Sequence, residues 1–160
     1  MNVKSGAEGA RVSLFVSWAH KDRRAKDALF DVLYLGSLAG LRVTVHGDFS
    51  VGVGVRWKPN ILEQMARCDF ALLLLSPAYV ASTFIAETEI PTLLGRPGDR
   101  ALPLLLKPLP LDGSRTLHGL EDLQVFTGPD GVSFLDTRGA ARERFARDLE
   151  TALRRRFRGE

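Results

Sequence analysis

The segment Phe70–Leu75, with the sequence FALLLL, restricts the fold of this chain more than any other feature. It is apolar throughout and shows no alternation with polar residues. A strand of this kind is buried on both faces, as at the centre of a parallel sheet covered by helices. It is far shorter than the ~20 residues that a membrane helix needs. We therefore expect an α/β protein with this segment inside its sheet.

Short apolar runs and amphipathic segments alternate along the rest of the chain, which is typical of parallel strands joined by helical crossovers. We expect a helix capped by Asp22, one with Pro59 in its first turn, and one capped by Ser82 that Pro91 kinks or ends. Pro103 favours a position near the sheet edge for its strand. The expected strands are residues 12–17, 41–46, 70–75, 101–106 and 132–135, and a last helix spans 138–157.

Five such strands predict a flavodoxin-like three-layer sandwich with a central five-stranded parallel sheet. The chain has 160 residues, which fits one domain. We assign residues 11–157 to this domain and residues 1–10 to a disordered tail. The tail has no apolar run, so it is not a secretory signal, and we expect a cytoplasmic protein without membrane contact.

Cysteine content and charge exclude several classes of protein. Cys68 is the only cysteine, which rules out a disulfide within the chain. With three scattered histidines, a zinc site is not expected, nor any other metal. The net charge is +3, with the basic excess concentrated in residues 154–158, a pattern typical of a solvated helix end. We see no basic stripe along the sequence and expect no direct binding of nucleic acid.

The familiar nucleotide and hydrolase motifs are absent from this sequence. Gly52 and Gly54 lack the third glycine of a dinucleotide-binding fingerprint. The chain holds neither the G-K-[ST] of a P-loop nor a G-x-S-x-G nucleophile turn. The first expected strand is also not followed by the acidic cluster of a phosphoacceptor domain. The chemistry must therefore come from other residues.

Polar and aromatic residues follow three of the expected strands, at ends that lie along one edge of a parallel sheet. Ligands bind at this edge in open α/β sheets. The first group is Ser17, Trp18, His20 and Lys21, the second is Asp48 with the glycine-containing loop, and the third is Ser76, Tyr79, Ser82, Phe84, Glu87 and Glu89.

Three segments in this order resemble the bacterial type of Toll/interleukin-1 receptor (TIR) domain. Residues 15–22 (FVSWAHKD) are similar to the opening box of that family, F-I-S-Y-S-H-x-D. Residues 48–57 match the pattern of its BB loop, D-x-x-x-x-x-G-x-x-W. Residues 74–89 match L-L-S-P-x-[FY]-x-x-S-x-[FYW]-x-x-x-x-E. The resemblance covers residues 11–157 and implies the TIR fold.

The resemblance also implies an activity, because many TIR domains cleave NAD⁺ and release nicotinamide. The catalytic glutamate of the family falls on Glu89 rather than Glu87. Helical spacing agrees, since Glu89 lies one turn beyond Ile85 on the face that packs inward. The alternative for Glu89 is a structural carboxylate that caps the helix or forms a salt bridge.

The substrate would be held by Ser17, Trp18, His20, Lys21, Asp48, Ser82 and Phe84. Trp18 and Phe84 either stack on nicotinamide or adenine or are simply core aromatics. His20 and Lys21 either meet the pyrophosphate or form an exposed loop pair.

The BB loop is expected to carry self-association, because similar TIR domains complete their NAD⁺ site across two copies. The residues assigned to this assembly are Phe49, Gly52, Val53, Gly54 and Trp57, with Trp57 packing the loop against the next helix rather than touching ligand. Val53 stands where the family often has proline.

We thus predict an NAD⁺ glycohydrolase or cyclase that forms ADP-ribose or a cyclic isomer and acts in bacterial antiphage immunity. NAD⁺ is its substrate, and no cofactor is expected. Homo-oligomers or filaments form through TIR–TIR contacts, and a sensor domain is linked or separate. The main alternative is a non-catalytic TIR–TIR interaction module, and a weaker one is a sensor that binds a nucleotide derivative without cleaving it.

Overall fold

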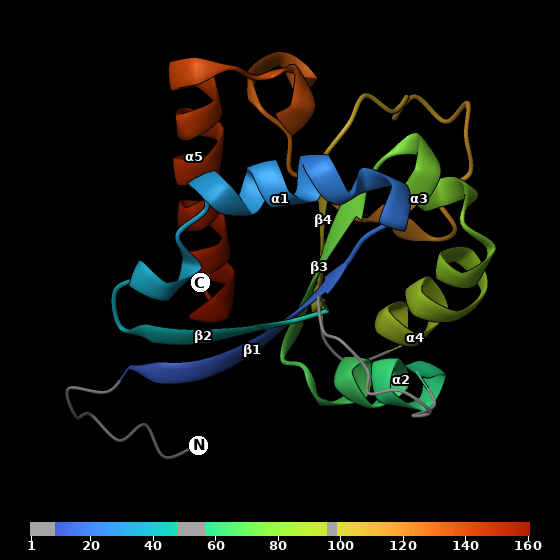
Figure 1. Ribbon diagram of the computed structural model, residues 1–160, viewed down its shortest axis with the longest axis horizontal. Helices are drawn as coiled ribbons and strands as arrows, with labels where there is room; N and C mark the ends of the chain where they lie inside the picture. Colours follow the sequence, from blue (N-terminus) through green and yellow to red (C-terminus); the bar gives the residue numbers. More distant parts are fainter. Residues whose placement is uncertain (1–8, 48–56, 96–98) are drawn as a thin grey trace.

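The computed structural model describes residues 9–47, 57–95 and 99–160 of the chain. Its centre is a parallel sheet in the order β2-β1-β3-β4 (Figure 1). The apolar segment Phe70–Leu75 forms β3, which lies inside the sheet as expected. The other strands are β1 (Ala10–Ser17), β2 (Leu41–His46) and β4 (Ala101–Leu105).

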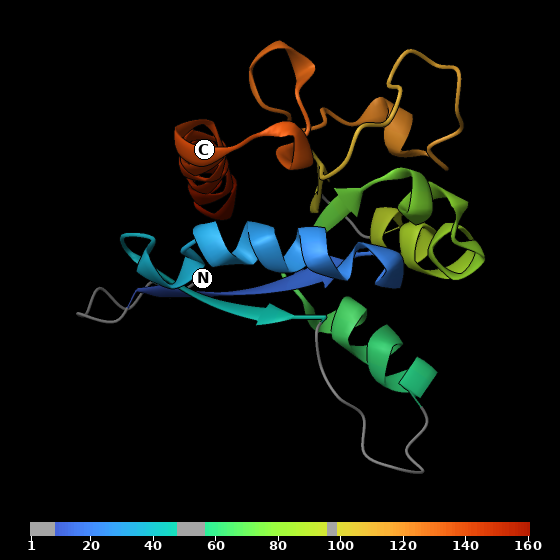
Figure 2. The same ribbon diagram turned by 45° about the horizontal axis from the view of Figure 1, so that its top comes forward.

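Helices cover both faces of this sheet, which confirms the flavodoxin-like sandwich (Figure 2). One face carries α1 (Arg23–Val32) and α5 (Gly139–Phe157). The other face carries α2 (Trp57–Arg67), α3 (Pro77–Ala81) and α4 (Ile90–Leu94). No helix in the described parts of the chain is long and apolar enough to span a membrane.

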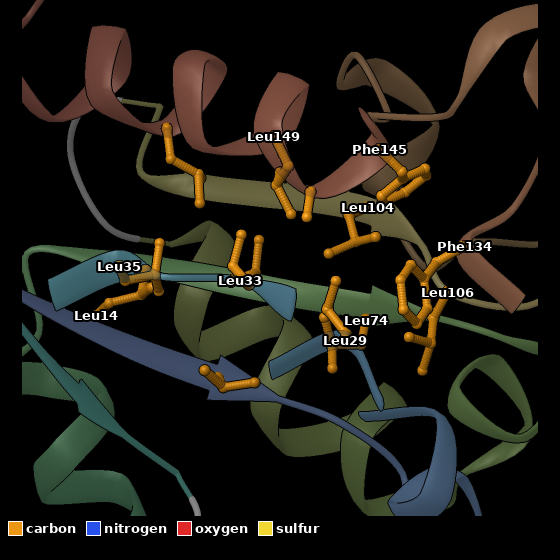
Figure 3. Packing of buried hydrophobic residues seen from close by; sticks show 14 of the residues in the cluster. Leu14, Leu29, Leu33, Leu35, Leu74, Leu104, Leu106, Phe134, Phe145 and Leu149 are labelled. Atoms are coloured by element: carbon orange, nitrogen blue, oxygen red, sulfur yellow. The ribbon is translucent and has the colours of Figure 1, made fainter. Parts of the chain in front are cut away.

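The strand β3 supplies both cores because its side chains alternate between the two faces. Leu72 and Leu74 pack toward α1 and α5, whereas Leu73 and Leu75 pack toward α2 and α4. Figure 3 shows the first of these cores. There Leu149 and Phe145 of α5 lie over strand residues such as Leu104. This double burial accounts for the absence of polar residues in the segment.

The fifth expected strand, residues 132–135, is wrong. The sheet of the described residues has four strands, and this segment leads into a short 3₁₀ turn, η6 (Phe134–Asp136). Val132 uses both backbone groups locally, since its amide donates to the Pro129 carbonyl and its carbonyl accepts from the Gly128 amide. Phe134 is buried against Phe145 and anchors the turn to the core.

The strand β4 lies at one edge of the sheet, as Pro103 predicts. Its outer side is met by a single bridge to Phe126 rather than by a full strand. The Phe126 amide donates to the Pro103 carbonyl at 2.8 Å, and the Leu105 amide donates to the Phe126 carbonyl at 2.9 Å.

The region between Ser76 and Gly95 differs in detail from the single helix that we expected. Ser76 caps the short helix α3 by accepting from the Tyr79 amide at 3.0 Å. Ser82 then caps the next turn as predicted, accepting from the Ile85 amide at 3.3 Å. The pair Ser76-Pro77 was the signal for the earlier start, because a serine cap followed by proline begins helices.

Pro91 does not end the helix, which continues to Leu94. The turn before it, η3 (Ile85–Glu89), is instead wound as a π-helix, and the Ile90 amide donates to the Ile85 carbonyl. A proline removes one helical hydrogen bond and crowds the carbonyl four residues earlier. The wider π turn accommodates both effects, and such turns are frequent at functional sites.

Candidate active site

A cavity of about 680 Å³ opens at the carboxyl ends of β1 and β3, the edge at which the sequence places the site. This volume is within the range of ligand pockets, about 300–1,000 Å³. Its walls come from β1, the 3₁₀ turn η1 (His20–Asp22), the first residue of α1, α2, α3 and η3. Among the residues expected to bind substrate or to catalyse, the lining includes Trp18, His20, Lys21, Ser82, Phe84 and Glu89.

Glu89 is the buried carboxylate of this cavity. Its side chain lines the wall although the residue is only 6% exposed, whereas Glu87 is exposed to solvent. Ile85, one turn earlier, is buried on the same side of the π turn. Burial raises the pKa of Glu89 from the ordinary 4.5 to about 7, and a hydrogen bond with Ser17 opposes this rise.

Ser17 lies beneath the cavity wall rather than in its lining, and it is fully buried. Its hydroxyl is 2.7 Å from the hydroxyl of the equally buried Tyr79. Burial raises the pKa of Tyr79, so this phenol stays protonated. A serine has one proton to donate. Because the Ser17 hydroxyl lowers the pKa of Glu89, Ser17 would donate to the ionised carboxylate, and Tyr79 would in turn donate to the Ser17 oxygen.

Trp18 forms part of the cavity wall but packs as a core aromatic, with 8% of its surface exposed. Its indole nitrogen donates to the Gly47 carbonyl at 3.2 Å. The ammonium of Lys26 lies 4.5 Å from the centre of the ring and the guanidinium of Arg23 lies 5.2 Å from it, both as cation–π contacts. Phe84, by contrast, is half-buried and lies in the lining beside Ser82.

Basic and polar side chains lie in the exposed part of the cavity lining. Lys21 and Arg23 carry positive charge there, and His20 lies beside them. Arg23 was not predicted from the sequence, although it belongs to the run His20–Arg24, which is rich in basic residues. The lining also has apolar residues, among them Ile61 and Ala78, which were not selected from the sequence. An anionic ligand with an apolar or aromatic portion would match this distribution.

Asp22 connects the ends of the strands behind the cavity instead of capping α1. It is only 1% exposed and makes no side-chain cap. Its carboxylate accepts from the Ser76 hydroxyl and lies 2.7 Å from the ammonium of Lys107. The Lys107 amide donates to the Leu75 carbonyl. This network joins the segments that follow β1, β3 and β4, and thereby fixes the loop that carries His20.

Five residues assigned from the BB loop lie outside the described part of the chain, as does the side chain of Trp57, the first residue of α2. They are Asp48, Phe49, Gly52, Val53 and Gly54. The preceding Gly47 lines the cavity with a φ of +109°. A Cβ at this position would lie 2.3 Å from the Val16 carbonyl oxygen, so only glycine fits.

A family model of the TIR domain matches residues 14–133, which is three quarters of the chain. The match begins within β1 and includes the other three strands, the residues that line the cavity, and Glu89. The chain therefore belongs to the TIR domain family, as the three sequence segments indicated. A comparison with curated proteins gives no match.

Proposed function

We propose that this TIR domain cleaves the bond between nicotinamide and ribose in NAD⁺, and that Glu89 is its catalytic residue. The observation that carries the proposal is a buried carboxylate in the wall of a cavity whose mouth is cationic. Burial disfavours the charged form of a carboxylate, so a carboxylate without a function would have a lower free energy in solvent. Perturbed groups of this kind concentrate at active sites.

The chemistry requires one anionic group beside the ribose. The bond breaks through an oxocarbenium-like state, whose positive charge the Glu89 carboxylate stabilises. Nicotinamide leaves as a neutral molecule because its ring already carries the positive charge in NAD⁺. No general acid is needed, which explains how one carboxylate suffices where most glycosidases use two. Water then completes ADP-ribose, or the adenine ring closes a cyclic isomer.

The remaining residues of the cavity would bind the two ends of the substrate. Lys21 and Arg23 would attract the pyrophosphate, because cations at a cleft mouth concentrate anionic ligands, and His20 would meet the pyrophosphate beside them. Phe84 offers an aromatic face to a base, while Ser82 and Asp48 would bind hydroxyl groups. Trp18 shapes the wall and does not stack on substrate, since its ring already packs against Lys26.

We further propose that a second copy completes this site through the BB loop, and that the protein acts in bacterial antiphage immunity with a sensor domain. In that case the free domain is weakly active when dilute. The alternative, an interaction module without chemistry, assigns Glu89 a structural role only. These two functions differ in whether NAD⁺ is consumed.

The decisive experiment is NAD⁺ consumption at high protein concentration, with chromatography of the products. Glu89→Gln keeps the shape and removes the charge, so NAD⁺ loss should fall by at least about 100-fold. Glu87→Gln is the matched control, because the same change is made on the exposed face of the same turn. Turnover by folded Glu89→Gln at the wild-type rate would exclude the catalytic role, and no turnover by wild type at any concentration would favour the interaction module.

A further inference from the structure

Arginine side chains gather at the edge of the sheet opposite the cavity, where the strands begin. Arg11 and Arg42 lie in register as neighbours in β1 and β2. Arg67 is the last residue of α2, shortly before β3, and Arg100 directly precedes β4. All four are exposed. The parallel topology thus sets one exposed arginine near the amino end of every strand.

The last turn of α5 brings further arginines to the same edge. Arg154 donates to the Ala39 carbonyl at 3.2 Å, just before β2, and Arg156 donates to the Asp99 carbonyl, just before β4. The ring of Phe157 packs on Phe70 at the start of β3, with 5.1 Å between centroids. We call this set the arginine rim; it comprises Arg11, Arg42, Arg67, Arg100, Arg154, Arg155, Arg156 and Arg158.

Acidic residues also lie near the arginine rim. Glu63 pairs with Arg67 at 2.8 Å, Asp69, Asp99 and Glu160 adjoin other members, and the Glu150 carboxylate accepts from the Tyr34 amide. Arg11 and Arg42 lie in register on neighbouring strands, so one bound anion could contact both guanidinium groups.

We propose that the arginine rim binds the phosphate backbone of single-stranded nucleic acid. The rim is made of arginines, and the planar guanidinium matches phosphate oxygens with paired hydrogen bonds. Four strands spaced by about 4.8 Å give a rim of roughly 14 Å before the end of α5 extends it. That length accommodates several backbone phosphates.

An exposed aromatic on the same side supports a single strand as the partner. Tyr34 follows α1, is 65% exposed, and lies shortly before the turn that leads into β2. Exposed aromatics beside a positive surface stack on unpaired bases. The other large apolar side chains exposed in the described residues lie elsewhere, at Val45, Leu111 and Leu135. One tyrosine gives too little apolar area for insertion into a membrane.

This surface is distinct from the cavity because the two lie at opposite ends of parallel strands. The expectation of no nucleic-acid binding rested on the lack of a basic stripe along the sequence. The tertiary structure assembles such a stripe from five separate segments. Nucleic acid and a ligand of the cavity would therefore bind together without competition.

The test is fluorescence anisotropy of a labelled oligothymidylate of about 20 nucleotides, titrated with the full chain at several salt concentrations. Arg11→Gln/Arg42→Gln removes two rim charges. Arg24→Gln/Arg115→Gln is the control, with the same change in net charge at exposed residues outside the rim. If both rim arginines contact phosphates, the rim variant should bind roughly 25-fold more weakly at 0.1 M salt, and its log–log salt slope should be smaller by about 1.4. The control should stay within about twofold of wild type.

Three results would overturn the proposal. They are the absence of binding by wild type, an equal loss in the control, and stronger binding to phosphatidylserine vesicles than to the oligonucleotide. Thermal unfolding of each variant checks that it is folded. If the first pair unfolds, Arg155→Gln/Arg158→Gln at the end of α5 makes the same test with residues outside the sheet, and an unchanged affinity there would equally refute the proposal.

Discussion

Glu89→Gln should stabilise the protein above neutral pH, because the buried carboxylate of Glu89 lowers the stability of the folded state. The folded pKa is about 7, against an ordinary value of 4.5 for the unfolded chain. Between these values the folded state binds a proton that the unfolded state has released. The free energy of unfolding therefore falls as pH rises through this window. Glutamine carries no charge and avoids this loss.

The size of the effect follows from the two pKa values. Their difference corresponds to about 3 kcal/mol once the pH exceeds the folded value, and to less than about 1 kcal/mol at pH 5. For a chain of this length, each kcal/mol changes the melting temperature by roughly 2–4 °C. At pH 8 the variant should thus melt roughly 6–12 °C above wild type.

Differential scanning calorimetry of wild type and variant at pH 5 and pH 8 measures this effect directly. The informative quantity is how much the difference in melting temperature between variant and wild type changes from pH 5 to pH 8. Other groups titrate in both proteins, so their effects cancel in this comparison. Glu87→Gln is the control and should show little difference at either pH, because Glu87 is exposed. A stabilisation that is equal at pH 5 and pH 8, or none at pH 8, would refute the argument that ionisation of the buried Glu89 destabilises the folded state.

Three further predictions concern the partners of this site. Ser17→Ala removes a hydrogen bond that lowers the pKa of Glu89, so the pH midpoint of NAD⁺ cleavage should rise by about one pH unit, with most of the rate regained at pH 9; an unmoved midpoint would exclude this role. Lys107→Met leaves the buried Asp22 carboxylate without its cation and should cost about 3 kcal/mol in urea unfolding, whereas a loss below about 1 kcal/mol would show that solvent replaces the ammonium. Val53→Asp should reduce the rise of specific activity with protein concentration without lowering the melting temperature, and wild-type behaviour over a hundredfold dilution would contradict assembly through the BB loop.

The central strands and their order along the chain could be predicted from the sequence because burial on both faces leaves an unmistakable pattern. Phe70–Leu75 needs apolar residues at every position, and the structure places it between β1 and β4. The selection of Glu89 over Glu87 also depended on a local property, since residues one turn apart share a helical face. The burial of Glu89 and the exposure of Glu87 agree with that selection.

Local patterns failed where a residue had two possible partners. Residues 132–135 have the composition of a strand, but the core needed Phe134 as an anchor, and the backbone of Val132 found partners in its own turn. Asp22 has the position of a helix cap, yet Lys107 and Ser76 offered its carboxylate a buried ion pair and hydrogen bond. Both partners are distant in sequence, so no local pattern could indicate them.

The sequence by itself determined the four segments that form the sheet of the described residues, although it also suggested a fifth, and it determined which family the domain belongs to and which carboxylate lies on the inward face. Only the tertiary structure decided that Ser17 and Tyr79 lie behind Glu89 and alter its ionisation. It alone also gathered arginines from five segments at one edge of the sheet. The physical reason is the range of the interactions. Burial and helical periodicity act on neighbours along the chain, so they leave a pattern in the sequence. Electrostatic and hydrogen-bond partners are set by the packing of strands and helices that are distant in sequence, so they leave none.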